Sequence, residues 1–119
     1  MRQCNIKWTV SLILIFVFFT PSVYAQNEQT KSVLVLNAYQ KGFPWTDNIV
    51  SGIESVLKPE ENNIELIVEY MDTKTMGYGA EYKQLLYELY SYKYRNHVFD
   101  IVISSDDNAF NFLREYHEK

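Results

Sequence analysis

The chain has 119 residues, and beyond residue 25 it carries nine Lys and Arg against 15 Asp and Glu, a net charge near −6. An acidic segment of this kind argues against a nucleic-acid partner, whose phosphates attract a basic surface. The only cysteine, Cys4, lies among the first 25 residues, so the rest of the chain excludes a disulfide framework. A segment of this length forms a small domain that buries about 60 to 65% of its unfolded surface.

The first 25 residues are typical of a signal peptide. Arg2 and Lys7 form a basic start, residues 10–19 are almost entirely apolar, and a small residue at the end suits signal peptidase. The apolar run is shorter than the roughly 20 residues that span a bilayer, although a generous count over 8–25 leaves an uncleaved signal anchor as an alternative. We therefore expect an extracytoplasmic protein, in the periplasm or at the cell surface, with residues 26–31 as a polar leader.

The first predicted elements are a strand and a helix. Residues 32–37, SVLVLN, form an apolar run without helical spacing, which predicts a buried strand, and a loop with glycine and proline follows. Beyond that loop, apolar residues recur on one face of a helix, at Ile49, Val50, Ile53, Val56 and Leu57. We expect Thr46 or Asp47 to cap this helix and Pro59 to end it.

Two more strands and two more helices are predicted in alternation. Residues 64–70, IELIVEY, form the second strand, and after a glycine-containing loop residues 80–95 give the clearest helix. The apolar stripe of that helix consists of Tyr82, Leu85, Leu86 and Leu89. Residues 99–104 predict the third strand, and residues 108–117 predict the third helix.

This alternation predicts an α/β fold, in which a parallel β-α-β-α-β-α sheet is joined by right-handed crossovers. Three strands are few for such a sheet, so we expect the first part of a larger lobe, truncated within or just after its third helix. If the strand order is 2-1-3, ligands bind beyond the carboxyl ends of the first and third strands, where the order reverses.

The loops at this predicted crevice hold the candidate ligand-binding residues. They are Asn37, Tyr39, Trp45, Ser105, Asp106 and Asp107. Together they offer aromatic rings, an amide, a hydroxyl and two acids, which suits a small molecule with a positive end.

Each candidate also has a purely structural interpretation. One acid of the pair Asp106 and Asp107 caps the third predicted helix. Trp45 packs as a hydrophobic staple on Ile49 or Val50 of the first predicted helix, or Asn37 only holds its own loop in place by bonding backbone amides. The tyrosines of the second helix favour a packing or interface stripe over a ligand site; they are Tyr87, Tyr90 and Tyr94. The two histidines have no partner at ligand spacing, so we expect no metal and no cofactor.

Three stretches carry a resemblance to a known family: KSVLVLNAYQKGFPWTDNIVSGI, VEYMDTK and YKYRNHVFDIVISSDDNAFNFL. Together they resemble the ABC-transporter-type substrate-binding proteins, a family that also serves as the extracytoplasmic sensor region of bacterial histidine kinases and diguanylate cyclases. The resemblance covers residues 31–116 and is most specific at PWTD, residues 44–47, and SDDNA, residues 105–109.

The resemblance implies a periplasmic-binding-protein-like fold, in which two α/β lobes close on a small molecule such as an amino acid or an aromatic compound. It also implies a membrane-embedded transporter or a kinase as partner or downstream domain. We expect the ligand-sensing region of a signal-transduction protein such as a sensor histidine kinase, or alternatively the solute-binding component of an ABC-type transporter.

Two other function classes fit the residues less well. A receiver-like phosphoacceptor needs acids after the first strand to hold magnesium, and Asn37-Ala38-Tyr39 offers none. An enzyme of flavodoxin-like architecture has no support either, because no glycine-rich phosphate loop follows the first strand and no Ser-His-Asp set can be assembled. We therefore expect binding without catalysis.

Overall fold

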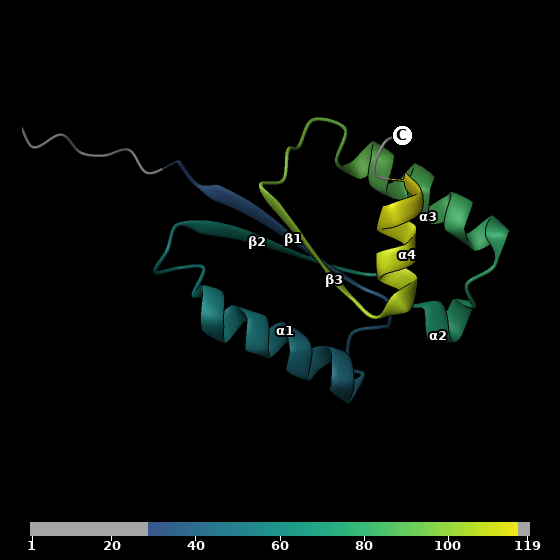
Figure 1. Ribbon diagram of the computed structural model, residues 1–119, viewed down its shortest axis with the longest axis horizontal. Coiled ribbons are helices and arrows are strands. Elements are labelled where there is room, and N and C mark those ends of the chain that lie inside the picture. The colour runs from purple at the N-terminus through teal and green to yellow at the C-terminus, as the bar shows by residue number, and fades with distance from the viewer. Residues whose placement is uncertain (1–28, 117–119) are drawn as a thin grey trace, which may run out of the picture.

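The computed structural model describes residues 29–116 and shows a three-stranded parallel sheet flanked by helices (Figure 1). The strands are β1 (Lys31–Asn37), β2 (Ile64–Tyr70) and β3 (Ile101–Ser105), and their order in the sheet is β2-β1-β3. The predicted α/β fold and strand order 2-1-3 are therefore confirmed. The expected signal peptide, with Cys4, and the predicted last helical residue His117 lie outside the described residues.

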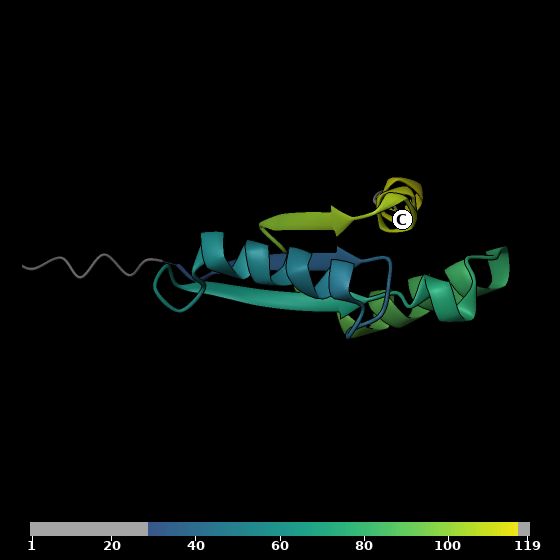
Figure 2. The same ribbon diagram turned by 90° about the horizontal axis from the view of Figure 1, so that it is seen from below.

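Helices cover both faces of the sheet. They are α1 (Pro44–Leu57), α2 (Thr73–Met76), α3 (Ala80–Lys93) and α4 (Asp107–Tyr116). Helix α1 lies on one side of the strands, and α3 and α4 lie on the other (Figure 1). Seen from below, the strands fan out with β3 at one edge, and all three carboxyl ends point toward the same end of the molecule (Figure 2). None of the helices within residues 29–116 is both long enough and apolar enough to cross a membrane.

The central strand β1 is mostly apolar, which suits its buried position in the middle of the sheet. It is buried along its whole length after Lys31, because it has a hydrogen-bonded neighbour on each side and a helix layer on each face. Val33 and Val35 belong to the α1 face, while Leu34 and Leu36 belong to the face that α3 and α4 cover. The core cluster on the latter face consists of Leu36, Ala38, Met71, Leu86, Ala109 and Phe112.

Helix α1 begins earlier than the sequence predicts. Its first residue is Pro44, and its N-cap is Phe43, whose side chain makes no cap hydrogen bond. A proline suits this first position because the missing N–H would have no helical partner there. Thr46 is instead fully buried within the first turn, and the Asp47 carboxylate accepts a hydrogen bond from the Gly42 N–H at 3.0 Å. The prediction that Thr46 or Asp47 caps α1 is therefore wrong.

The other predicted boundaries match the structure, as for both ends of β2, or differ from it by one or two residues, apart from one extra helix. The predicted loop before α3 contains the single-turn helix α2, which local spacing does not reveal. Helix α3 also turns a different stripe inward, because Leu85 and Leu89 are 56% and 54% exposed. Leu86 is buried, and Tyr82 and Tyr90, four residues to either side of it, pack toward the core. The predicted apolar stripe is thus only half correct.

Candidate ligand site at the carboxyl edge of the sheet

The strand order reverses between β1 and β3, and that reversal places a candidate site at the carboxyl ends of these strands. Asn37 ends β1 and lies opposite Ser105, which ends β3. The loops beyond them are held together because the Ala38 N–H donates to the Ser105 carbonyl oxygen at 3.2 Å. The two predicted ligand-binding loops therefore do meet at one edge of the sheet.

Asn37 is fully buried at this edge. Its side-chain Nδ2 donates to the Glu69 carbonyl oxygen at 3.2 Å, which links β1 to β2. The alternative that the Asn37 side chain only holds its own loop in place is wrong, since its hydrogen bond goes to the neighbouring strand. The other end of the amide, Oδ1, is buried and has no hydrogen-bond partner among the described residues.

A hydrogen-bond network that was not predicted from the sequence links the loops at the same edge. Both the N–H and the Oγ1 of Thr73 donate to the Ala38 carbonyl oxygen, at 2.9 and 2.8 Å. Asn108 Nδ2 in turn donates to Thr73 Oγ1 at 3.1 Å. The loops after all three strands are thus joined. The sequence did contain a signal for these two residues. Thr73 lies in VEYMDTK and Asn108 lies in SDDNA, and both stretches carry the resemblance to the substrate-binding family.

The adjacent acids Asp106 and Asp107 occupy different environments. Asp107 is exposed in the first turn of α4, where its charge suits the positive end of the helix dipole. Asp106 is half-buried, and its Oδ2 accepts a hydrogen bond from Ser105 Oγ at 3.1 Å. Its backbone is left-handed, with φ of 72°, a conformation that is uncommon for residues other than glycine. Asp106 is therefore the better ligand candidate of the pair.

A second acid at this edge, Asp72, was not singled out from the sequence. It follows β2 closely and also has a left-handed backbone, with φ of 51°. Its Oδ1 is buried without a hydrogen-bond partner in the described part of the chain. Strained backbone of this kind concentrates at ligand-binding positions, since the surrounding structure must hold it in place.

The predicted aromatic residues separate into two environments. Tyr39 meets Phe43 edge to face, with 5.6 Å between ring centroids, and Lys74 Nζ lies over both rings at 4.4 and 4.0 Å from their centroids. The electron-rich faces of Tyr39 and Phe43 are therefore already in contact with a cation, the Lys74 ammonium. Trp45 is the second residue of α1 and 58% exposed, so the hydrophobic-staple interpretation is wrong.

Four buried side-chain oxygens, at the end of β1, in the loops after β1 and β2 and in the first turn of α1, have no hydrogen-bond partner among the described residues. They are Asn37 Oδ1, Gln40 Oε1, Thr46 Oγ1 and Asp72 Oδ1. Most buried polar groups in proteins have a partner, so such a group calls for a bound water or a ligand. Residues 29–116 contain no group of three or more His, Cys, Asp or Glu side chains that suits a metal ion.

Comparison with known proteins adds no relative. No family model matches the chain, no curated protein matches it, and no solved structure matches it.

Proposed function

We propose that the chain is part of an extracytoplasmic small-molecule-binding module, namely the ligand-sensing region of a bacterial signal-transduction protein such as a sensor histidine kinase. The observation that carries this proposal is the set of buried oxygens at and after the carboxyl ends of β1 and β2 that have no hydrogen-bond partner within residues 29–116. The resemblance of the loop after β1 and of the turn after β3 to the substrate-binding family supports it. The proposed location rests on the signal-peptide pattern of the first 25 residues.

The chemistry of the edge favours a ligand with a positively charged end. An amide oxygen and a carboxylate oxygen accept hydrogen bonds from an ammonium group, and Asn37 and Asp72 supply one of each that no other described residue contacts with a hydrogen bond. Asp106 adds a further carboxylate in the loop after β3, directly after Ser105, which pairs with Asn37. Lys74, held over the rings of Tyr39 and Phe43, offers a cation to a ligand carboxylate. An amino acid matches this pattern of charges.

The adjacent acids provide a matched test of this proposal. Binding of each of the twenty common amino acids is measured by titration calorimetry for the parent protein, Asp106→Asn and Asp107→Asn. Losing a charge-assisted hydrogen bond costs about 1.5 to 3 kcal/mol, so Asp106→Asn should weaken the bound amino acid about ten- to a hundredfold. Asparagine tolerates a left-handed backbone, so the substitution should leave the turn intact.

Asp107→Asn serves as the control because it changes the neighbouring, exposed acid. We expect it to change affinity less than threefold. If the parent and both variants bind the amino acid with equal affinity, Asp106 and Asp107 have only a structural role. Absence of binding for all twenty amino acids would remove the proposed ligand class.

A further inference from the structure

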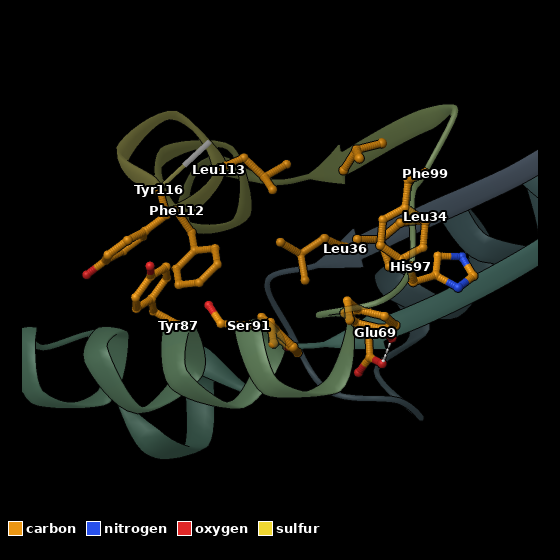
Figure 3. Close-up of a pocket in the computed structure, with 13 residues that line it drawn as sticks. Leu34, Leu36, Glu69, Tyr87, Ser91, His97, Phe99, Phe112, Leu113 and Tyr116 are labelled. Carbon is orange, nitrogen blue, oxygen red and sulfur yellow. Dashed lines mark hydrogen bonds between the residues drawn. The ribbon is translucent and has the colours of Figure 1, made fainter. Parts of the chain in front are cut away.

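A concave region lies between α3 and α4 over one face of the sheet, away from the candidate residues at the carboxyl edge (Figure 3). It is a cavity of about 530 Å³, within the range of roughly 300 to 1,000 Å³ that small-molecule sites occupy. Leu34 and Leu36 of β1 line its floor. Aromatic side chains in and directly after the two helices form most of its walls: Tyr87 and Tyr90 from α3, Tyr94 at the C-cap of α3, and Phe112 and Tyr116 from α4.

The tyrosine stripe of α3 packs against α4, as the sequence interpretation favoured. The rings of Tyr87 and Tyr116 are stacked, with centroids 4.7 Å apart and an interplanar angle of 19°. The ring of Tyr90 meets Phe112 edge to face at 5.9 Å. These contacts fix the ring orientations, and the rings that they fix also line the cavity. Packing and cavity lining are therefore properties of the same stripe.

A few polar groups converge on this aromatic enclosure. The Glu69 carboxylate of β2 lines it and accepts hydrogen bonds from the Tyr94 hydroxyl and the Lys93 ammonium. Burial raises the pKa of Tyr90, and burial together with the Glu69 bond raises the pKa of Tyr94, so both hydroxyls stay protonated near neutral pH. Ser91 contributes another hydroxyl to the lining.

The charge of the lining restricts the ligand. Among the described residues that form it there is one carboxylate, that of Glu69, which is paired with the Lys93 ammonium beside the cavity; the lining also contains the His97 imidazole and neither a lysine nor an arginine. Tyrosine faces carry partial negative charge, which attracts cations and the positive edges of aromatic rings. The cavity thus complements a neutral or cationic molecule and disfavours an anion.

We propose that this cavity is a second binding site, which takes a flat aromatic molecule that is neutral or cationic and carries a hydrogen-bond donor. The ring lies among the fixed tyrosine and phenylalanine rings, and the donor reaches the Glu69 carboxylate or a tyrosine hydroxyl. Its lining residues are distinct from Asn37, Ser105 and Asp106. Binding at this cavity can therefore be tested independently of the proposed amino-acid site at the carboxyl edge.

Four small probes test the ligand class on the full chain by saturation-transfer NMR titration. Phenol and cyclohexanol have the same size and hydroxyl group and differ in the flat aromatic ring, while benzylamine and benzoate differ mainly in the sign of their charge. We expect saturable binding of phenol and benzylamine and at least tenfold weaker binding of cyclohexanol and benzoate. Equal binding of phenol and cyclohexanol, or no saturable binding of either aromatic donor, would overturn the proposal.

Substitutions locate the binding. Ser91→Trp fills the cavity from α3, and Val102→Phe fills it from β3, so each should weaken phenol binding at least tenfold. Leu85→Trp adds the same large ring at a position of α3 that is 56% exposed and does not line the cavity, so binding should remain within twofold. Near-ultraviolet circular dichroism selects the variants that keep the parent fold. Unchanged phenol affinity in a folded Ser91→Trp or Val102→Phe variant would place the probe elsewhere and refute the assignment.

Discussion

Strand β3 lies at an edge of the sheet and carries apolar side chains that its neighbours leave partly uncovered. Ile101 is 54% exposed and Val102 is 43% exposed. An apolar hollow flanks the strand on each face, one formed with Val56 of α1 and the other with Phe110 of α4. An uncovered apolar edge is a template for pairing with another strand. We therefore expect residues 26–119 to self-associate through β3.

The structure sets the scale of this association. Fully burying an Ile, Val or Phe side chain stabilises by about 1.5 to 3 kcal/mol. The four side chains around the edge retain between 43% and 78% of their exposure: Ile101, Val102, Val56 and Phe110. Covering what remains is worth about 3.5 to 7 kcal/mol in each copy, or about 7 to 14 kcal/mol for two copies. An association cost at the low end of the range of about 4 to 15 kcal/mol leaves a net stabilisation of about 3 to 10 kcal/mol. A dissociation constant between about 50 nM and 5 mM follows.

Replacing Ile101 by Lys tests the edge directly. The change removes one half-buried apolar contact from each copy and sets two like charges close together, so we expect a loss of about 2 to 3 kcal/mol, or about 30- to 150-fold in the dissociation constant. Size-exclusion chromatography with light scattering, over a range of protein concentrations, measures the change. Leu85→Lys is the control, because it adds the same charge at an exposed position of α3. A monomer that stays soluble at high concentration and melts cooperatively would refute the reasoning.

Two further predictions concern stability. Tyr82→Phe removes the hydroxyl that donates to the Met71 carbonyl oxygen at 2.6 Å. Urea denaturation should therefore show that the free energy of unfolding falls by about 1 to 2 kcal/mol. Tyr92→Phe is the control at an exposed position and should change that free energy by less than about 0.5 kcal/mol. The Ser32 N–H bonds the Asp100 carboxylate at 2.8 Å and, with Lys31 nearby, lowers the pKa of that carboxyl. A carboxyl with a lowered pKa stabilises the fold only while it is ionised, which is at pH values above the ordinary aspartate range. Asp100→Asn should therefore lower the urea midpoint at pH 7. The difference in urea midpoint between the variant and the parent should vanish as the pH falls below about 3. A difference that persists at pH 2 would contradict this origin.

The amino-acid sequence by itself determined the order and type of the main elements. The run SVLVLN is apolar at every position but its ends, and such a run is stable only where both faces and both edges of a strand are covered, as in β1. The helical spacing of apolar residues likewise identified α1, α3 and α4. These features depend on neighbours within a few positions along the chain, so local patterns reveal them.

Tertiary structure decided which residues of those elements meet. In α3 the sequence favours Leu85 and Leu89 as buried residues, but the large tyrosine rings turn inward because they reach across to α4. Asp106 and Asp107 are adjacent and chemically identical in sequence, but in the structure Asp106 has a left-handed backbone and a half-buried carboxylate, whereas Asp107 is exposed. Thr73 and Asn108 join the edge through a bond that spans 35 positions in the chain. Contacts over such separations follow from the strand order and the crossovers, which a local pattern does not encode.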